Sequence, residues 1–388
     1  MKVIFEKEKL LSVLIPAATI APNKNTNYIL ECVLFECPSD REGKCRISAY
    51  DMEKGLRTYV DCETVEEGSF AMNSQNILQI VRSMPDGNII LEVDKRNRAK
   101  ISGGSASFEI GAFPGESYPA LPLLSGDKNY KLPQHVFRDL INKTIFAASQ
   151  TEIGKAFSGI LFKAENNTLT CVGCDRFMIA AAEYEGTEEM IENKFIVPAK
   201  VLSEIVRNVK DTEDEMVISV ARKHVVISIG EYLYFSRLID DEYVNYKRIL
   251  AFPSDTDFFV NCKAFLSAVE RASIVTEDRL GGKTKNSLVI NYKNKVMEIT
   301  SNSANGSVYD EIPAASEDID EEMTFKYNCR YIMNVLKAAS EDTSTIKISL
   351  SSSKLGMGTM GMKVTNGDSD PESSVDYTYY IMPINNLK

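Results

Sequence analysis

The sequence predicts an α+β fold of three repeated units, each with two helices that back antiparallel sheets. Three observations lead to this prediction: one amphipathic helix pattern occurs three times, a second helix pattern recurs with nearly the same period, and runs of β-forming residues separate the helices. A chain of 388 residues also exceeds the size, about 250 to 300 residues, at which a single core stops growing. We therefore expect three domains, at residues 1–126, 127–253 and 254–388.

The first helix pattern is clearest at residues 195–209. Three apolar side chains there share one helix face at the spacing i, i+3 and i+4, namely Leu202, Ile205 and Val206. Lys200 and Arg207 share the roughly opposite face, so the helix has a basic outer side. Arg82 and Lys337 take the place of Arg207 in the other two copies, 125 residues before it and 130 residues after it. The chain therefore repeats with a period of about 129 residues.

The second helix pattern begins near Leu11, Phe137 and Phe265, which are 126 and 128 residues apart. Several β-like runs lie between the helices, without the one-helix-per-strand spacing of a doubly wound fold, and this favours an α+β architecture. Residues 121–133 and 251–258 contain proline and aspartate and are expected to join neighbouring units.

Composition limits the classes of protein that the chain can represent. Apolar residues make up 44% and charged residues 26%, which is typical of globular proteins and argues against long disorder. The N-terminus lacks the apolar region of a signal peptide and no run of eighteen apolar residues occurs, so we expect a soluble, cytoplasmic protein with no membrane partner. A net charge of −11 argues against a surface that binds nucleic acid everywhere, but it allows a local basic face.

No catalytic motif stands out. Cys171 and Cys174 form one CxxC pair without a second pair or nearby histidines, so structural cysteines are the main interpretation and a redox or metal site is the alternative. The glycines at 356–361 spell GxGxxG without a following helix pattern, and GGKT at 281–284 lacks the first glycine of a phosphate loop. We therefore expect no catalytic residue, no metal and no cofactor.

Five short segments carry a resemblance to a known family: MKVIFEKEKLL at 1–11, NYIL at 27–30, FPGESYPALP at 113–122, FIVPAK at 195–200 and MPI at 382–384. In their order and spacing, the sequence resembles the bacterial sliding clamp, the beta subunit of DNA polymerase III. The resemblance implies three domains of the DNA clamp type, with two chains joined head to tail as a homodimer ring around duplex DNA. It implies a non-catalytic subunit that tethers the replicative polymerase for processive synthesis.

The resemblance also implies which residues face DNA. Lys24, Arg82, Lys200 and Arg207 match or lie near basic DNA-facing positions of the family. Gln75 stands at another position that is often basic, so weaker contact is expected there. Binding would be independent of DNA sequence, because contacts to phosphates carry no base information.

A second implied site is an apolar pocket between the second and third domains that binds short linear peptides of polymerases, the clamp loader and repair proteins. Carried over position by position, the pocket would consist of Phe157, Cys174, Arg176, Phe177, Met178, Ile179, Val244, Ile249, Met382, Pro383 and Ile384, with Met360 and Met362 as further candidates. The sequence departs from the family here, because it reads CDRFMI where threonine, aspartate, glycine, histidine or tyrosine, arginine and leucine are usual. A pocket rich in aliphatic residues and methionine suits anchors of varied shape.

For the ring joint, the resemblance implies that Phe108 and Ile110 of one chain meet Ile274 and Val275 of the other. The alternation of the segment around Phe108 also suits an exposed strand edge that needs a partner. Two alternatives remain open from sequence: a redox or metal protein built on the CxxC pair, and a monomeric adaptor that binds peptides without encircling DNA.

Overall fold

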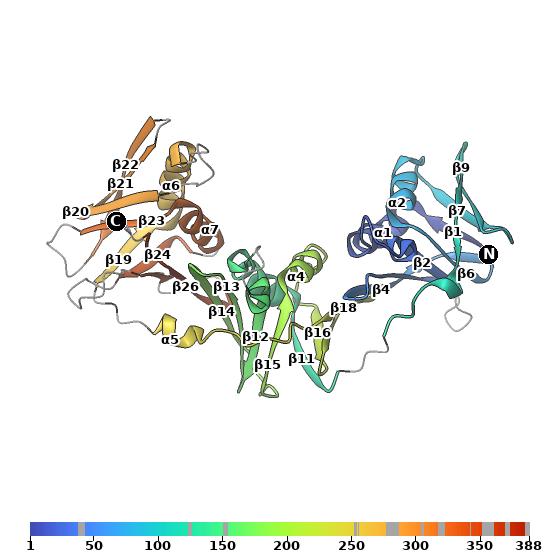
Figure 1. The fold of residues 1–388 in the computed structure, drawn as a ribbon, viewed down its shortest axis with the longest axis horizontal. Helices are drawn as coiled ribbons and strands as arrows, with labels where there is room; N and C mark the ends of the chain where they lie inside the picture. The colour runs from blue at the N-terminus through green and yellow to red at the C-terminus, as the bar shows by residue number, and fades with distance from the viewer. Residues whose placement is uncertain are drawn as a thin grey trace. The chain divides into compact units, whose positions relative to one another are not determined.

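The computed structural model describes residues 1–37, 43–122, 126–149, 154–251, 254, 256–276, 287–303, 306–316, 323–341, 343–350, 361–368 and 373–384. Their contacts divide the chain into two compact units, and Figure 1 shows the fold of both. The first unit contains Met1–His135 and Lys200–Leu238, and the second contains Val136–Ala199 and Ile239–Lys388. The middle of the sequence therefore contributes to both units.

The first unit is built mainly from the first third of the chain and from three strands of the middle third. Its elements are β1 (Lys2–Glu6), α1 (Lys7–Ile20), a 3-10 helix η1 (Tyr28–Glu31), β2 (Cys32–Cys37), β3 (Lys44–Tyr50), β4 (Lys54–Asp61), β5 (Glu63–Glu66), β6 (Gly68–Asn73), α2 (Ser74–Ser83), β7 (Asn88–Val93), β8 (Arg98–Gly103), β9 (Ala106–Gly111), β10 (Phe113–Pro114), a 3-10 helix η2 (Gly115–Ser117), β11 (Lys128–Pro133), β16 (Glu215–Val220), β17 (His224–Ile229) and β18 (Tyr232–Arg237).

Two antiparallel sheets form the first unit. One has the strand order β5-β1-β7-β8-β9, and the other has the order β10-β6-β2-β3-β4-β18-β17-β16-β11. Strand β18 pairs with β4 in the register Leu233 to Arg57 and Tyr234 to Leu56, so strands from two repeats share one sheet. Helix α1 packs on β3 and β4 and against α2.

The second unit contains the rest of the middle third and the last third of the chain. Its elements are α3 (Gln134–Asn142), η3 (Ile145–Ala147), η4 (Lys155–Ser158), β12 (Gly159–Glu165), β13 (Thr168–Cys174), β14 (Met178–Glu185), β15 (Asn193–Pro198), α5 (Tyr246–Leu250), β19 (Thr256–Asn261), α6 (Cys262–Thr276), β20 (Ser287–Lys293), β21 (Val296–Ser303), β22 (Gly306–Ala315), β23 (Met323–Asn328), α7 (Cys329–Ala339), β24 (Thr345–Leu350), β25 (Met362–Asn366) and β26 (Val375–Ile381). Helix α3 begins at the end of the first unit, and α4 (Ala199–Val206) lies almost wholly in it.

One sheet runs through the second unit in the order β15-β12-β13-β14-β26-β25-β24-β19-β22-β21-β20-β23. Strand β26 pairs with β14, from Met178 opposite Ile381 to Tyr184 opposite Val375. Strand pairing therefore also joins the middle and last repeats.

The recurring helices are confirmed. The first pattern forms α2, α4 and α7, and the second forms α1, α3 and α6. Ile77, Ile80 and Val81 of α2 are buried, as are the matching apolar residues Ile332, Val335 and Leu336 of α7. Asn73 caps α2 by accepting the backbone N–H of Asn76 at 3.1 Å, which satisfies one of the free donors of the first turn.

A buried ion pair links two repeats inside the first unit. The Nζ atom of Lys54 on β4 lies 2.6 Å from the Glu204 carboxylate on α4 and 3.3 Å from the carbonyl oxygen of Thr19 on α1. The two charged side chains are only 9% and 11% exposed. Each of these two charges compensates the other, because burying an unpaired charge lowers the folding stability by several kcal/mol.

Among the helices of the described ranges, none is both long enough and apolar enough to cross a membrane.

Replacing Glu204 with alanine is expected to destabilise the first unit by about 3 kcal/mol, because the Lys54 ammonium then stays buried without its counter-charge. Urea unfolding followed by circular dichroism measures this loss. The double variant Lys54→Met with Glu204→Leu should recover most of it, since two apolar groups leave no charge unpaired.

The matched control is Glu53→Ala, which removes the partner of Arg237 in a pair whose side chains are 68% and 55% exposed. This change should cost less than about 1 kcal/mol. Equal losses for the two alanine variants would contradict the importance assigned to the buried pair.

Candidate functional site

An apolar pocket with a volume of about 210 Å³ opens on the second unit. It lies where β13 ends, β14 begins, and η4, α5 and the end of β26 come together. Its lining residues are Phe157, Cys174, Asp175, Arg176, Phe177, Met178, Ile179, Val244, Ile249, Tyr380 and Met382. Most of these side chains are apolar, which suits burial of an apolar group from a partner.

A tight turn between β13 and β14 forms one wall of the pocket. The Asp175 carboxylate accepts the backbone N–H groups of Phe177 and Met178, each at 2.7 Å, and the Asp175 N–H donates to the Met178 carbonyl at 3.0 Å. This turn leaves Phe177 51% exposed although it is large and apolar. The Met382 N–H donates to the Phe177 carbonyl at 2.8 Å, which ties the turn to the end of β26.

The Phe177 ring stacks on the ring of Tyr331 from α7, with the centroids 6.1 Å apart and the planes at 25°. Burial and the nearby Asp175 carboxylate raise the pKa of Tyr331 to about 12, so its hydroxyl stays protonated at neutral pH. Burial also raises the pKa of Asp175, although its backbone hydrogen bonds act in the opposite direction. The wall is therefore held by hydrogen bonds and ring stacking while its apolar face points outward.

The opposite wall comes from the segment that leads to α5. Tyr243 anchors this segment by donating its hydroxyl to the Val172 carbonyl at 2.9 Å, and its ring lies 6.4 Å from that of Phe157. Asn245 caps α5 by accepting the N–H of Arg248 at 3.3 Å. This arrangement fixes Val244 on the pocket side.

Nine of the eleven residues predicted from sequence for a peptide pocket line this cavity. Pro383 and Ile384 do not line it, because the chain turns after Met382 and the Ile384 N–H donates to the Lys326 carbonyl of β23 at 2.9 Å. Of the further candidates, Met362 is buried in the core of β25 and Met360 lies outside the described residues.

Sequence reasoning missed two lining residues, Asp175 and Tyr380. Tyr380 could have been found, because it lies on β26 two residues before Met382, which directly follows the strand, and alternate residues of an extended chain share a face. Asp175 could have been predicted as a turn residue, since the aspartate side chain readily accepts hydrogen bonds from backbone groups two or three residues further on.

The four residues predicted to face DNA all lie in the first unit and are exposed. Lys24 follows α1, Arg82 is on α2, Lys200 is on α4 and Arg207 directly follows α4. Within the described ranges, none of the four side chains makes an ion pair. Figure 1 shows α1, α2 and α4 on the same side of the nine-stranded sheet. The Gln75 side chain bonds the Ala18 carbonyl at 3.1 Å and so links α2 to α1.

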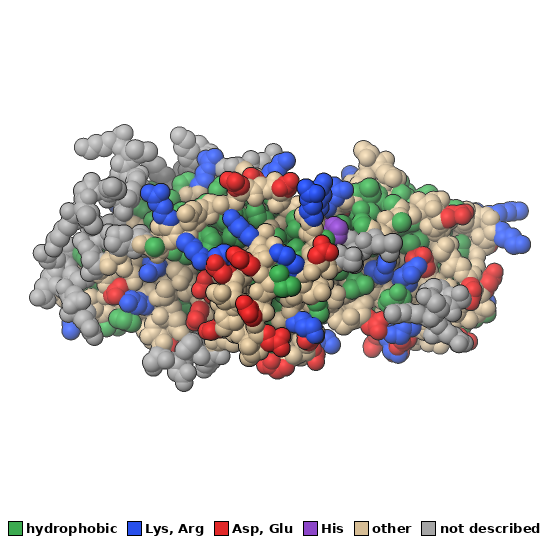
Figure 2. Space-filling model, turned by 90° about the horizontal axis from the view of Figure 1, so that it is seen from below, with side chains coloured by type: hydrophobic (Ala, Val, Ile, Leu, Met, Phe, Trp, Pro, Cys, Tyr) green, Lys and Arg blue, Asp and Glu red, His purple; other side chains and the backbone are tan. Residues whose placement is uncertain are grey.

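The face of the molecule drawn in Figure 2 carries acidic and basic side chains next to each other. A net charge of −11 is therefore compatible with local groups of exposed cations.

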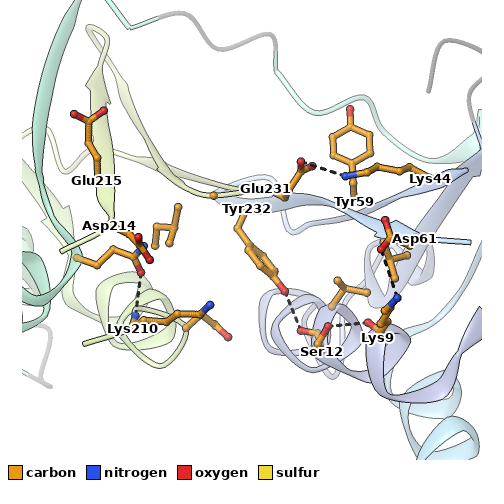
Figure 3. A pocket seen from close by; sticks show the side chains of 16 residues that line it. Lys9, Ser12, Lys44, Tyr59, Asp61, Lys210, Asp214, Glu215, Glu231 and Tyr232 are labelled. Carbon is orange, nitrogen blue, oxygen red and sulfur yellow. Dashed lines mark hydrogen bonds and ion pairs between the residues drawn. The ribbon is translucent and has the colours of Figure 1, made fainter. Parts of the chain in front are cut away.

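A second pocket, of about 510 Å³, lies in the first unit between elements of two repeats. Figure 3 shows Glu231 and Tyr232 of the β17–β18 turn reaching toward the first repeat, where Lys44 pairs with Glu231 at 3.2 Å and the Tyr232 hydroxyl donates to the Ser12 carbonyl at 3.3 Å. Lys9 on the same side pairs with Asp61 at 3.7 Å. Because these charges neutralise one another, the pocket offers no strong attraction for a charged ligand.

The CxxC pair is part of the core. Cys171 is fully buried in β13 and Cys174 is 3% exposed at its end. Burial raises the pKa of both thiols, that of Cys174 to about 12, so neither forms the reactive thiolate at neutral pH. In the part of the chain that is described, no three His, Cys, Asp or Glu side chains are placed to hold a metal ion. This geometry favours structural cysteines over the redox or metal alternative.

The residues predicted for a ring joint lie at exposed places. Phe108 is 41% exposed on β9, which is the last strand of its sheet and pairs only with β8 among the described strands. Ile110 lies partly buried on the same strand. Ile274 is 80% exposed near the end of α6, and Val275 follows it.

Comparison with known proteins identifies the family. Three family models match consecutive parts of the chain: the N-terminal, central and C-terminal domains of the DNA polymerase III beta subunit, at residues 1–122, 131–245 and 247–360. The beta sliding clamp of Halalkalibacterium halodurans is 28% identical over 304 residues, which are 75% of this chain and 76% of the relative. That of Bacillus subtilis is 26% identical over 287 residues, 74% of each chain.

Solved structures show the same fold. A putative DNA polymerase III beta subunit from Eubacterium rectale superposes with a TM-score of 0.87 at 25% identity, over 99% of this chain and 100% of that chain. A sliding clamp from Pseudomonas aeruginosa, bound to griselimycin, superposes with a TM-score of 0.88 at 21% identity over 99% of each chain. The chain therefore belongs to the DNA polymerase III beta subunit family of sliding clamps, which are non-catalytic processivity factors.

Proposed function

We propose that this sliding clamp works as a head-to-tail homodimer that encircles duplex DNA and tethers the replicative polymerase, the clamp loader and repair proteins through short peptides. The same proposal includes three domains, at residues 1–126, 127–253 and 254–388, and a cytoplasmic location. The observation that carries it is a pair of open strand edges, on β9 and on β22, each near an exposed apolar side chain. A monomeric adaptor does not require open strand edges, so they favour the dimer.

Both edges are strands that can accept a further strand on one side. β9 has no described partner on its outer side, and β22 pairs with β19 only through Ala314 and Ala315. Residues 306–313 of β22 therefore keep one edge free of described partners. Open edges with apolar side chains tend to pair with another chain. Because they come from different repeats, two copies joined head to tail could close into a ring.

Charged substitution of Ile274 and Val275 is expected to convert the dimer into a monomer, because two carboxylates would be buried without partners in the joint. Sedimentation at low micromolar concentration should then give a mass near 43.3 kDa in place of a value near twice that mass. The fold should stay intact, since Ile274 is already 80% exposed.

The control for this experiment is Ile191→Asp, which changes an isoleucine that is 53% exposed in another part of the second unit. It should leave the dimer whole. A dimer that persists in the Ile274→Asp and Val275→Asp double variant would show that the joint lies elsewhere.

Loose DNA contact is what sliding requires. Side-chain cations attract phosphates without reading bases, so the protein keeps no fixed register on the duplex. Lys200 and Arg207 are exposed and make no described ion pair, so their charges are available to phosphates. Enclosure by the ring would supply retention, and the cations would only centre and hold the duplex weakly.

Neutralising Lys200 and Arg207 together as alanines is expected to shorten retention on nicked circular DNA and to lower the salt dependence of binding. The loss of two phosphate contacts should reduce the slope of log K against log salt by about 1.8. The melting temperature should hardly change, because both side chains are exposed. Retention times measured at several salt concentrations test this.

Arg222→Ala with Lys223→Ala is the matched control, since it removes the same charge from the exposed β16–β17 turn of the same unit. Retention equal in both double variants would rule out a special role for Lys200 and Arg207.

The apolar pocket is proposed to hold the peptides. Phe177 lines the pocket and is 51% exposed, and Tyr331 is the one described aromatic ring that its own ring stacks on, so a partner side chain can cover it. Aromatic residues that a partner buries often dominate the binding energy of an interface.

Phe177→Asp is expected to weaken peptide binding by at least about thirtyfold, which corresponds to ~2 kcal/mol for a dominant contact. The probe is a dodecamer selected from a displayed random library on the unchanged protein, and fluorescence anisotropy measures its affinity. Val65→Asp, at a residue 56% exposed on β5, is the control and should bind normally. Undiminished affinity in Phe177→Asp, with the dimer intact, would disprove the pocket assignment.

A further inference from the structure

The wall of the apolar pocket formed by Phe177 carries positive charge. Arg176 lines the pocket, is exposed, and makes no ion pair within the described ranges. Arg330 is also exposed and directly precedes Tyr331, the residue on which Phe177 stacks. The pair of stacked rings is therefore flanked in the chain by two arginines whose charges no described acid neutralises.

Asp175, the one acidic residue among the described lining residues, does not offset this charge. Its Oδ1 atom already accepts two backbone N–H groups at 2.7 Å, and its carboxylate interacts with the Tyr331 hydroxyl. The negative charge is thus directed into the turn. The guanidinium of Arg176 remains available to a ligand.

The segment that forms the opposite wall carries charges of both signs, because the exposed Lys247 and Arg248 of α5 follow three acidic residues. Asp240, Asp241 and Glu242 are exposed and lie just before Val244, which lines the pocket. Asp241 is held near η4, because its Oδ2 atom accepts the Ala156 N–H at 3.2 Å. Acids and bases both occur on that wall, whereas Arg176 is the one basic side chain among the described lining residues, so a ligand carboxylate would be attracted to it.

We propose that the pocket prefers peptides with Asp or Glu beside the apolar anchor, placed so that the carboxylate meets Arg176. This inference rests on the peptide-binding function proposed above and adds the chemical class of the peptide. A guanidinium suits the task, because its planar set of N–H donors can bind both oxygens of a carboxylate.

The experiment selects dodecamers from a displayed random library on three proteins: the unchanged clamp, Arg176→Gln and Arg248→Gln. Arg248 is a matched control, since it is an exposed arginine next to Ile249 on the other wall. The expected result is enrichment of Asp and Glu beside apolar residues with the unchanged clamp and with Arg248→Gln. The enrichment should disappear with Arg176→Gln.

One selected peptide and its twin with Gln for Glu, or Asn for Asp, are then compared by fluorescence anisotropy. The acidic peptide should bind about two- to fivefold more tightly than its twin, as expected for a partly exposed ion pair, and the difference should shrink at high salt. Arg176→Gln should bind both equally. Arg176→Lys should restore part of the difference, because a lysine keeps the charge without the planar donors.

The outcomes separate the two levels of the proposal. One outcome is that the selected peptides bind the unchanged clamp, fail to bind Phe177→Asp and show no enrichment of Asp or Glu. That result would overturn the role of Arg176 and leave the pocket assignment in place. Selected peptides that bind Phe177→Asp normally would remove the pocket assignment and this inference with it.

Discussion

The pairing of strands from neighbouring repeats is the constraint on which the rest of the structure depends. In the first unit β18 continues the sheet at β4, and in the second unit β26 continues the sheet at β14. Backbone hydrogen bonds make these joints, and any residue except proline can supply them. Solved structures only 25% and 21% identical can therefore share the fold, with TM-scores of 0.87 and 0.88. The open strand edges on β9 and β22 could pair with another chain through the same kind of backbone hydrogen bonds.

The two joints differ in how side chains fill them. At the first, Tyr50 ends β3 and its ring meets that of Phe235 with centroids 6.0 Å apart, while the Tyr118 hydroxyl donates to the Cys32 carbonyl at 3.1 Å. At the second, the residue that ends β13 is the much smaller Cys174, and an open pocket lies beside it. Aromatic rings therefore fill the first joint, whereas at the second the aromatic rings stand around a pocket that is left open beside Cys174 and can accept an apolar group.

Periodicity predicted the helices well because their apolar faces must be buried at every third or fourth residue, as Ile332, Val335 and Leu336 are. It could not predict α5, which has only five residues and hence no period to detect. It also gave no sign of the Lys54–Glu204 pair, since 150 residues separate the partners and each reads as an ordinary surface charge. The pocket residues came from family resemblance, and Pro383 and Ile384 lie outside the lining of the cavity because the direction of the chain after β26 depends on tertiary contacts.

The proposed function requires loose contact with DNA and specific contact with peptides, and the exposed charges of this chain suit that division. The four cations proposed to face DNA are exposed, and three of them, Arg82, Lys200 and Arg207, lie on or directly after helices. Long side chains at such places can follow a phosphate backbone without a fixed geometry. The Asp175 carboxylate, in contrast, accepts hydrogen bonds from backbone N–H groups of its own turn. These bonds hold Phe177 outward in the wall of the pocket. A net charge of −11 disfavours binding of DNA over the whole surface, so the proposed DNA contacts depend on local groups of cations. Loose binding thus needs charged side chains that are left unpaired at the surface, whereas specific binding needs charged side chains whose hydrogen bonds fix the shape of a pocket.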